Sequence, residues 1–256
     1  MQNLKIAALQ IDIIPNNAIA NCANIEEQIW EMDQKIDLII LPELFNVGFH
    51  FDKNSIEPAN FTTFKWMKRM STIAQATIFG SILEKDGIHV YNRAYAIHPD
   101  GSYQSYDKRH LFIKSDEPLI CTPGSTQVTF DIKGWKIQPT ICFDLRFPVW
   151  CRNINKADVL LNIANWPSKR VDVFTTLLKS RAIENQTYTI GVNRIGSDLS
   201  GGLYNGNSSI YNFKGELINQ PNSKEQTVIF ELDKEELLAF RNNNPYLDLQ
   251  DSFTIN

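Results

Sequence analysis

Three strand-like runs in this sequence each end at a side chain that can take part in covalent chemistry. Glu43 follows the run LIILP, Lys108 follows SYD, and Cys142 follows IQPTI. Active residues of α/β proteins gather where buried strands end. A carboxylate, an ammonium and a thiol that meet at such an edge form a set suited to acyl transfer.

The three side chains could together provide a nucleophile, a base and a cation for acyl transfer. A free thiol has a pKa of about 8.5, so only a few per cent is thiolate at neutral pH. Glu43, with its pKa raised by burial, would take the thiol proton during attack. Lys108 would stabilise the thiolate and then the tetrahedral oxyanion. The backbone N–H of Phe143 would assist if Cys142 stands on a tight strand-to-helix turn.

Each of the three residues alone also has an ordinary structural explanation. Most buried cysteines act only as small hydrophobic residues. A carboxylate after a proline is most often part of a turn or a helix cap, and a lysine at a strand end usually protects a sheet edge. Only the combination of the three predicts an active site.

The sequence does not indicate other common hydrolase arrangements. It contains no G-x-S-x-G, Walker A or H-E-x-x-H motif, and no G-x-G-x-x-G opens a helix after a strand. A Cys–His hydrolase would need a histidine paired with Cys142. None of the four histidines forms a recognisable pair of this kind; they are His50, His89, His98 and His110.

The composition is typical of a globular protein. The chain has 256 residues, of which 43% are hydrophobic, and a net charge of −4 from 25 basic and 29 acidic residues. These values exclude a disordered chain and argue against a dedicated nucleic-acid binder. We find no export signal and no apolar run of about 18 residues, so we expect a cytoplasmic protein that does not enter a membrane. The four cysteines form no CxxC motif and are expected to stay reduced.

Strand-like and helix-like segments alternate around these residues. Strands are predicted over 4–9, 37–41, 77–83, 88–97, 102–107, 126–132, 135–141, 159–163 and 187–193. Helices are predicted over 18–32, 64–74, 147–155, 170–185 and 233–241. This pattern predicts an α/β protein with mixed sheets and outer helices. Because no linker interrupts it, we expect a single domain over 1–256. A strand–helix–strand order in each half would suit a sandwich of two sheets.

Three short motifs surround the candidate residues: LPELF at 41–45, YDKRHLF at 106–112 and ICFDLRFP at 141–148. Two further blocks are ANWP at 164–167 and RAIENQ at 181–186. Together, and over essentially the whole chain, they resemble the nitrilase superfamily of carbon–nitrogen hydrolases.

The resemblance implies a fold and a role for each residue. The family fold is a four-layer αββα sandwich of two mixed β-sheets flanked by helices, usually found as a homodimer, and its chemistry uses neither a metal nor an organic cofactor. Glu43 would be the general base, Lys108 the electrophilic stabiliser and Cys142 the nucleophile. The family also has a second glutamate shortly after the lysine. Glu117 is the natural candidate, with the adjacent Asp116 as competitor.

The stretches DKRHLF and CFDLRFP look like the ω-amidase branch of this family. Members of that branch hydrolyse the terminal amide of short dicarboxylic acid monoamides such as 2-oxoglutaramate and 2-oxosuccinamate. Such a substrate needs a cation for its free carboxylate, one short chain away from the thiol. Arg146, four residues after Cys142, would lie one helical turn further on the same side and can bind a carboxylate with two hydrogen bonds. An ion pair within the protein is the alternative for Arg146.

Several other residues carry weaker expectations. Phe45, Phe49, Phe143 and Trp166 are candidates for the apolar walls of a substrate pocket, with core packing as the alternative for each. Asn92 is expected to satisfy backbone groups near the site.

Two further segments have structural explanations. Arg181 and Glu184, three residues apart, are expected to form a buried structural pair. The run 196–207 is rich in Gly, Ser and Asn, which favours a surface loop over an anion cradle.

Other functions stay open. Within the family, an N-carbamoyl-amine hydrolase and a true nitrilase are the alternatives. A metal-dependent phosphoesterase can also use an αββα sandwich, with Glu43 and Asp144 as metal ligands. A non-catalytic binding relative is a third alternative, against which the complete Glu/Lys/Cys set argues.

Overall fold

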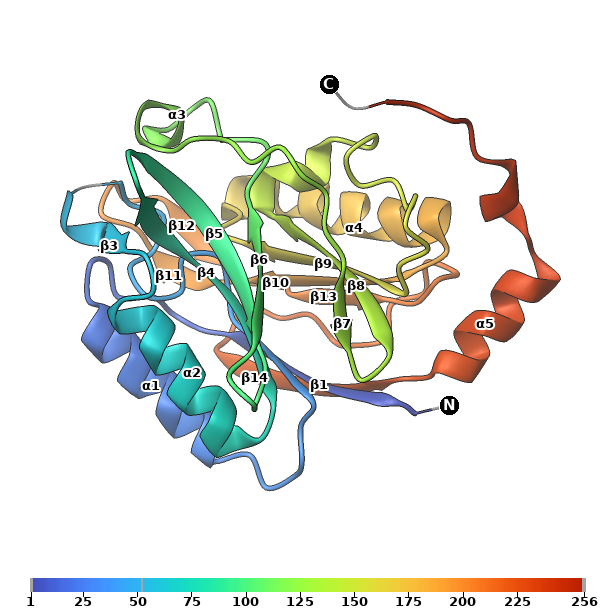
Figure 1. Cartoon of the computed structure of the whole chain (residues 1–256), viewed down its shortest axis with the longest axis horizontal. Helices are drawn as coiled ribbons and strands as arrows, with labels where there is room; N and C mark the ends of the chain where they lie inside the picture. The colour runs from blue at the N-terminus through green and yellow to red at the C-terminus, as the bar shows by residue number, and fades with distance from the viewer. Residues whose placement is uncertain (1, 52, 255–256) are drawn as a thin grey trace.

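The computed structural model describes residues 2–51 and 53–254, and it folds as two β-sheets that pack face to face with helices outside (Figure 1). The first sheet has the order β14 (Gln226–Leu232), β1 (Leu4–Gln10), β2 (Leu38–Ile40), β4 (Thr77–Asp86), β5 (His89–Ile97) and β6 (Tyr103–Asp107), with β3 (Glu57–Pro58) beside β4. The second has the order β13 (Ser209–Tyr211), β10 (Tyr188–Asn193), β9 (Val159–Ala164), β8 (Trp135–Ile141) and β7 (Phe130–Ile132). A separate ribbon pairs β11 (Ile195–Ser197) with β12 (Leu203–Asn205).

The helices are α1 (Ala18–Trp30), α2 (Thr62–Ala74), α3 (Glu117–Ile120), α4 (Val171–Asn185) and α5 (Lys234–Asn243). Short 3₁₀ turns occur at η1 (Lys53–Ser55), η2 (Cys142–Arg146), η3 (Ser168–Arg170) and η4 (Tyr246–Leu249). The pair α1 and α2 covers one outer face, and α4 covers the other (Figure 1). The predicted αββα sandwich is therefore confirmed.

Both sheets are parallel at the centre and antiparallel at the edges. In the first sheet β1, β2 and β4 run parallel, and in the second β8, β9 and β10 do so. The parallel strands bring their carboxyl ends to one edge of each sheet. Glu43, Cys142 and Asn165 all follow such strand ends, so the topology itself gathers them.

The alternation of side chains along the strands divides the apolar residues between two interfaces. On β2, Leu38 and Ile40 face the second sheet, whereas Ile39 faces α1 and α2. Phe79 of β4 reaches across the sandwich to Phe130 of β7, with ring centroids 6.0 Å apart. The core between the sheets therefore fixes the distance between the two sets of strand ends.

Two predicted elements are wrong. The helix expected over 147–155 is replaced by a run of turns that follows η2, because the Asn153 side chain bonds backbone groups there. The Asn153 amide donates to Ala157 O at 3.0 Å, and its oxygen accepts from Ala157 N at 2.6 Å. Asparagine that bonds local backbone in this way favours loops over helices. The strand expected over 126–132 is also shorter, since β7 begins only at Phe130.

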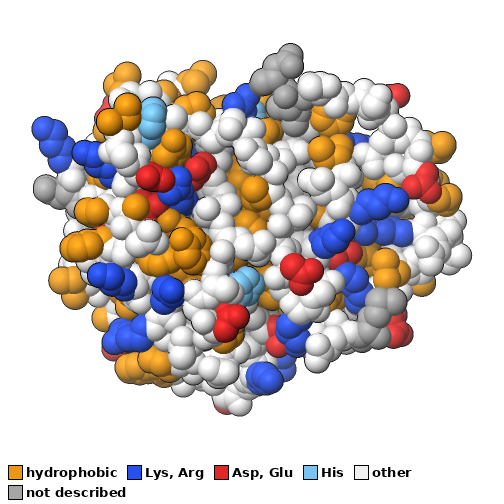
Figure 2. All heavy atoms as spheres, in the orientation of Figure 1, with side chains coloured by type: hydrophobic (Ala, Val, Ile, Leu, Met, Phe, Trp, Pro, Cys, Tyr) orange, Lys and Arg blue, Asp and Glu red, His pale blue; other side chains and the backbone are white. Residues whose placement is uncertain are grey.

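The surface is mixed in character. Lys and Arg side chains are interspersed with Asp, Glu and apolar ones over the face shown in Figure 2. No helix in the described part of the chain is both long and apolar enough to cross a membrane.

Candidate active site

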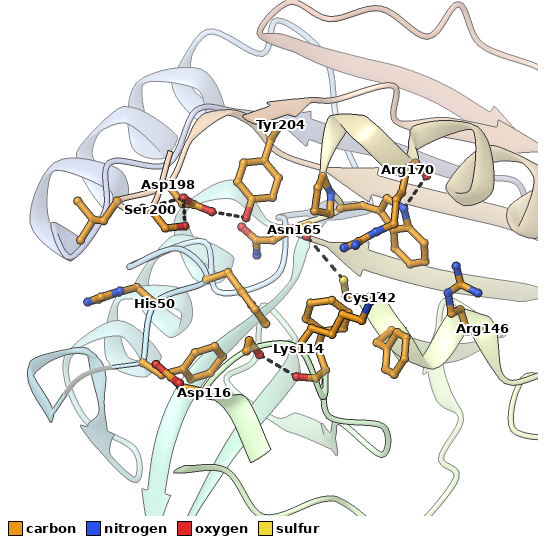
Figure 3. Close-up of a pocket in the computed structure, with 18 residues that line it drawn as sticks. His50, Lys114, Asp116, Cys142, Arg146, Asn165, Arg170, Asp198, Ser200 and Tyr204 are labelled. Atoms are coloured by element: carbon orange, nitrogen blue, oxygen red, sulfur yellow. Dashed lines mark hydrogen bonds between the residues drawn. The ribbon is translucent and has the colours of Figure 1, made fainter. Parts of the chain in front are cut away.

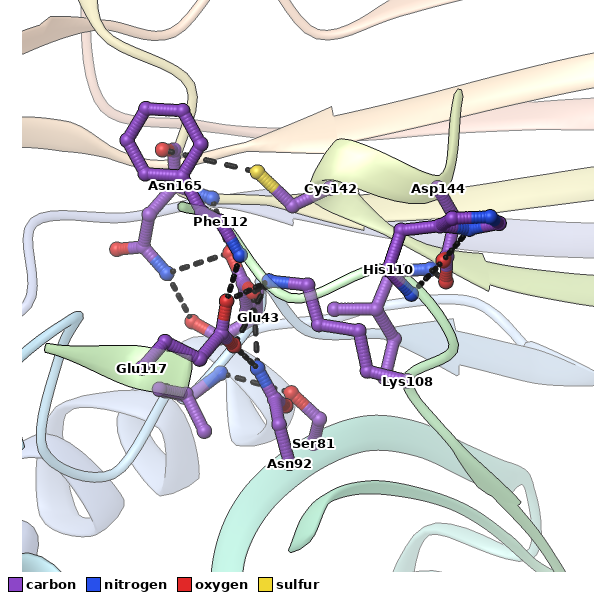
Figure 4. Close-up of polar contacts among 12 residues, drawn as sticks. Glu43, Ser81, Asn92, Lys108, His110, Phe112, Glu117, Cys142, Asp144 and Asn165 are labelled. Atoms are coloured by element: carbon purple, nitrogen blue, oxygen red, sulfur yellow. Dashed lines mark hydrogen bonds and ion pairs between the residues drawn. The ribbon is translucent and has the colours of Figure 1, made fainter. Parts of the chain in front are cut away.

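Glu43, Lys108 and Cys142 meet between the two sheets, as predicted from three distant points of the sequence. Glu43 lies just past β2, Lys108 directly after β6, and Cys142 directly after β8. The Lys108 ammonium donates to Glu43 Oε1 at 2.7 Å, and both side chains are fully buried. Figure 4 shows Cys142 beside this pair on the second sheet, with its thiol directed toward the backbone oxygen of Asn165.

Glu117 completes the cluster, and Asp116 does not. Lys108 Nζ donates to both Glu117 oxygens, at 2.9 and 3.0 Å, and Glu117 Oε2 also accepts the Phe112 backbone N–H at 2.7 Å. Asp116 is exposed at the rim. Pro118 occupies the first turn of α3, where its missing N–H sacrifices no helical bond. The proline thus helps to start the turn that carries Glu117 inward.

Asn92 of β5 joins the two carboxylates. Its amide donates to Glu43 Oε1 at 2.9 Å and to Glu117 Oε1 at 3.0 Å. The expectation that its side chain satisfies backbone groups is therefore wrong. Two buried carboxylates need several donors, and an amide supplies them without adding charge.

Asn165, which the sequence analysis missed, holds Glu43 from the second sheet. Its backbone N–H donates to Glu43 Oε2 at 2.9 Å, and its side-chain amide donates to Glu43 O at 2.6 Å. Its backbone oxygen accepts from Cys142 Sγ at 3.9 Å. Asn165 follows the buried strand β9 directly, so the same strand-end argument that selected Cys142 could have found it.

Cys142 stands on a tight turn from β8 into η2, as expected. Its φ is +44°, in the left-handed region that a non-glycine residue adopts only under strain of about 1–3 kcal/mol. The Asp144 carboxylate holds the turn, because Oδ2 accepts the Ile141 backbone N–H at 3.0 Å. This turn directs the thiol out of the strand and into the site.

The same carboxylate connects the cysteine segment to the lysine segment. Asp144 accepts from Tyr106 Oη at 2.6 Å and from both His110 N and His110 Nδ1 at 2.8 Å. Asp144 lies two residues after Cys142, and His110 lies two residues after Lys108. A single fully buried side chain therefore bonds both the segment that carries the Cys142 thiol and the segment that carries the Lys108 ammonium.

Burial and neighbouring charges determine the protonation of the site. Burial, and then the charge of Glu43, raise the pKa of the Cys142 thiol well above its usual value, although Lys108 opposes them. Burial would lower the pKa of Lys108, but the charges of Glu117 and Glu43 outweigh it and raise that pKa. The resting site therefore holds a neutral thiol and a charged lysine. Such a thiol needs a base at the moment of attack, and Glu43 is the adjacent carboxylate.

The cluster opens into a cavity of about 610 Å³, a volume typical of small-molecule sites (Figure 3). The four substrate-binding residues predicted from the sequence all line it: Phe49, Phe143, Arg146 and Trp166. Phe45 does not, because its buried ring packs against Trp66 of α2 at 5.7 Å. The cavity is also lined by residues that the sequence analysis did not select, among them Arg170, Asp198, Ser200 and Tyr204.

The run 196–207 forms one wall of the cavity. It folds as the β11–β12 ribbon, and Tyr204 Oη donates to Asp198 Oδ2 at 2.8 Å. Asp198 also accepts from Ser200 and Gly202 N–H groups, at 2.9 and 2.8 Å. Because a carboxylate occupies these donors, the run does not present them to an anion.

Arg181 and Glu184 form the predicted structural pair. Arg181 Nη1 lies 2.9 Å from Glu184 Oε1, and Arg181 Nη2 donates to Leu145 O at 2.8 Å. The pair therefore supports the η2 turn from the α4 side. Among the residues that the structure describes, no group of three or more His, Cys, Asp or Glu side chains is arranged to hold a metal ion.

Known proteins share this sequence and fold. Residues 5–242 match the family model of the carbon–nitrogen hydrolases. The chain is 37% identical to omega-amidase YafV of Escherichia coli (strain K12) over 256 residues, which is the full length of both proteins. It is 31% identical to the 2-oxoglutaramate amidase of Bacillus subtilis (strain 168), with 95% of this chain and 96% of the other covered.

A solved structure extends the likeness to three dimensions. The crystal structure of XC1258 from Xanthomonas campestris, a CN-hydrolase superfamily protein, superposes with a TM-score of 0.96 at 33% identity and covers all of both chains. These matches confirm the resemblance first seen in the three motifs. With its Glu–Lys–Cys cluster at the ends of the strands, this chain belongs to the carbon–nitrogen hydrolase family of the nitrilase superfamily.

Proposed function

We propose that the protein is an amidase that hydrolyses the terminal amide of short dicarboxylate monoamides, of the 2-oxoglutaramate and 2-oxosuccinamate type, through a thioester on Cys142. The observation that carries the proposal is the buried Glu43–Lys108–Glu117 cluster beside Cys142, which itself lines a cavity together with Arg146. The names of the relatives from E. coli and B. subtilis support the same substrate class.

The first step forms the thioester. Cys142 Sγ attacks the amide carbon while Glu43 takes the thiol proton, and the carbonyl oxygen becomes an oxyanion. Lys108 Nζ and the Phe143 backbone N–H stabilise that oxyanion, because a preorganised cation and an early N–H of a helical turn both favour developing negative charge. Glu43 then returns the proton to the amide nitrogen, the C–N bond breaks, and ammonia leaves.

The second step releases the acid. A water molecule gives a proton to Glu43 and attacks the thioester carbon, so that a second oxyanion forms at the same donors. The C–S bond then breaks, and the sulfur recovers the proton from Glu43. Glu117 keeps Lys108 charged and oriented through both steps, since it accepts two hydrogen bonds from the ammonium. All groups in the cycle are supplied by this chain and by water.

The substrate's free carboxylate binds at Arg146. This guanidinium lines the cavity that Cys142 also lines, and it can form two parallel hydrogen bonds to a carboxylate. The rings of Phe49 and Phe143 and the Trp166 indole exclude water from the carbon chain between the amide and the carboxylate. An amide without a carboxylate would lack the anchor.

Ammonia release from 2-oxoglutaramate, glutamine, asparagine, an N-carbamoyl amine and a nitrile tests the proposal. We expect the highest kcat/KM on 2-oxoglutaramate, and no turnover in Cys142→Ala, which should keep the fold. Preference for the nitrile or the carbamoyl amine would instead favour the other family activities. Full activity in Cys142→Ala would refute the mechanism.

Three features of the whole protein stay predictions. We expect one domain, a homodimer and a cytoplasmic location. A single unfolding transition and a sedimentation mass of two chains would support the first two, and cell fractionation tests the third.

A further inference from the structure

We infer that Arg170 is a second specificity-determining residue and that the substrate carboxylate binds between its guanidinium and that of Arg146. The inference rests on the proposed function and deepens it. Arg170 ends the 3₁₀ turn η3, directly before α4, and lines the same cavity as Cys142 and Arg146.

The Arg170 backbone is held in place by its neighbours. Its N–H donates to Pro167 O at 2.9 Å, and its carbonyl accepts from Trp166 Nε1 at 2.8 Å. Ser168 Oγ donates to Leu203 O at 2.9 Å and ties the turn to β12. The side chain therefore starts from a fixed point of the cavity wall.

The Arg170 guanidinium is half-buried over an aromatic ring. Its Cζ lies 5.2 Å from the centre of the Phe112 ring. Stacking on a ring orients a guanidinium and leaves the N–H groups at its edge available. Arg146 is more exposed than Arg170, so of the two cations Arg170 is the less hydrated.

Neither guanidinium has an anionic partner among the residues that the structure describes. Within residues 2–51 and 53–254, no carboxylate forms an ion pair with Arg146 or Arg170, and neither group donates a side-chain hydrogen bond. By contrast, three other buried or nearly buried arginines each have a carboxylate within 2.9 Å; they are Arg93, Arg181 and Arg194. Removing a cation from water is costly without a partner, and this cost falls on the half-buried Arg170. A second cation, Arg146, lines the same cavity, and two such positive charges favour an anionic ligand.

Arg146 and Arg170 lie apart from the two acidic side chains of the cavity lining. Figure 3 shows both arginines on the side that carries Cys142, with Asp116 and Asp198 on the other side. Lys108 is already neutralised by Glu43 and Glu117. A monoamide that places its amide at the thiol would therefore meet the positive charges of Arg146 and Arg170 on the same side of the cavity.

The test compares three variants on two substrates of equal length, 2-oxoglutaramate and the neutral pentanamide. Arg170→Met keeps an aliphatic stem against Phe112, Arg170→Lys keeps the charge without the planar fork, and Lys169→Met is the control at an exposed neighbour. In Arg170→Met we expect kcat/KM on 2-oxoglutaramate to fall about 10- to 100-fold, mainly through KM, which is the loss expected for charge-assisted hydrogen bonds.

The ratio of the two substrates identifies the role. We expect the 2-oxoglutaramate to pentanamide ratio of kcat/KM to fall about tenfold or more in Arg170→Met, to fall less in Arg170→Lys, and not to change in Lys169→Met. An unchanged ratio in Arg170→Met, with or without a general loss of activity, would overturn the inference while the proposed function stands.

A second measurement does not depend on turnover. Glutarate, a plain dicarboxylate, should slow the alkylation of Cys142 by iodoacetamide in the wild type, and much higher concentrations should be needed in Arg170→Met. If the wild type rejects 2-oxoglutaramate but glutarate protects in this Arg170-dependent way, the proposed substrate is wrong and the arginine pair stands. Equal protection in both proteins, or none in either, would overturn the pair.

Discussion

Cys142 and Glu43 depend on each other because the site keeps the thiol protonated. Burial and the Glu43 charge raise the pKa of Cys142, so a permanent thiolate is not available at neutral pH. Lys108 cannot change this balance, since its own charge is shared by two carboxylates. In the proposed mechanism, proton removal therefore coincides with attack, and Glu43 accepts the proton at that moment.

The four cysteines should differ sharply in reactivity. Burial, followed by the charge of Glu57 for Cys22 and of Glu117 for Cys121, raises the pKa of each of these two thiols to about 12. At pH 7.5 we expect iodoacetamide to label Cys142 alone, and Glu43→Gln to slow that labelling at least tenfold. Peptide mass spectrometry of the labelled protein measures both.

The labelling rates of Cys22 and Cys121 should increase with pH, because only the thiolate reacts. Below a pKa of about 12 the thiolate fraction rises tenfold for each pH unit, so the labelling rates of Cys22 and Cys121 should rise about tenfold per unit between pH 8 and 10. Labelling of Cys22 or Cys121 at the rate of Cys142 at pH 7.5 would contradict this assignment.

Glu117 and Asp116 are adjacent acids with opposite surroundings, so a substitution of Asp116 is a control for a substitution of Glu117. Glu117 is fully buried and holds Lys108, whereas Asp116 is exposed. Glu117→Gln keeps the shape but removes the charge that orients the ammonium, so we expect kcat to fall about 100-fold or more, as for the loss of an oxyanion donor. Asp116→Asn should stay within threefold of the wild type. Steady-state ammonia release measures both, and equal losses would remove the distinction.

At the residue scale, the residues that gather in the site could be predicted from the sequence more reliably than the residues that hold them in place. Glu43, Lys108 and Cys142 could be predicted because each ends a strand-like run with an unusual side chain. Asn165 and Arg170 were missed because an amide or an arginine beside a turn has many ordinary uses. Only the three-dimensional contacts show that Asn165 bonds Glu43 and that Arg170 has no acidic partner among the described residues.

At the scale of elements, the short loops after β6 and β8 decide whether the site is assembled. Asp144 joins them, since it accepts hydrogen bonds from Tyr106 and His110 on the lysine side and from Ile141 on the cysteine side. Trp150 Nε1 donates to Tyr106 Oη at 2.9 Å, so the phenol is bonded on both sides. A change in this network should move the nucleophile relative to the lysine.

Tyr106→Phe tests that connection with little change in shape. The substitution removes one of the hydrogen bonds to Asp144 and leaves the buried Trp150 N–H without its acceptor, which should lower the free energy of unfolding by about 1–3 kcal/mol. We also expect kcat to fall while KM changes little, because the cavity is unaltered. Urea unfolding and steady-state kinetics measure the two effects.

Tyr103→Phe, on the same strand but with a side chain that is 47% exposed, is the matched control. It should stay within about 0.5 kcal/mol of the wild type and keep its activity. If Tyr106→Phe lost stability without any loss of kcat, the network would be structural only.

Helices and strands with a regular spacing of apolar residues could be predicted from the sequence, and those without it could not. The helices over α1, α2 and α4 follow from apolar residues at helical spacing, and most central strands follow from apolar runs. The prediction of a helix over 147–155 was wrong because the residue spacing there resembles that of a helix, whereas the Asn153 side chain bonds local backbone groups and favours turns. The α3 turn was missed because four residues give too little periodicity to detect.

At the scale of the whole molecule, the site exists because two sheets meet. Glu43 and Lys108 come from the first sheet, and Cys142 and Asn165 from the second. Strand and helix patterns predicted the class of fold, but local patterns carry no information about which face packs on which. The family resemblance supplied the two-sheet arrangement, and the structure shows the reason for it in the apolar residues shared between the sheets.

Phe79 tests whether the packing between the sheets maintains the site. Its fully buried ring meets Phe130 across the sandwich, with ring centroids 6.0 Å apart. Phe79→Ala should lower the free energy of unfolding by about 3–5 kcal/mol, because it leaves a cavity that the surrounding strands cannot close. Phe79→Leu retains most of the volume and should lose much less. Ile88→Ala, in the exposed β4–β5 turn, is the control and should leave the free energy of unfolding nearly unchanged.

If the contact between the sheets sets the distance between Cys142 and Lys108, kcat measured well below the unfolding transition should fall in Phe79→Ala and recover in Phe79→Leu. Full kcat in a folded Phe79→Ala protein would show that the hydrogen bonds of Asp144 and Asn165 hold the site together without the core beneath it.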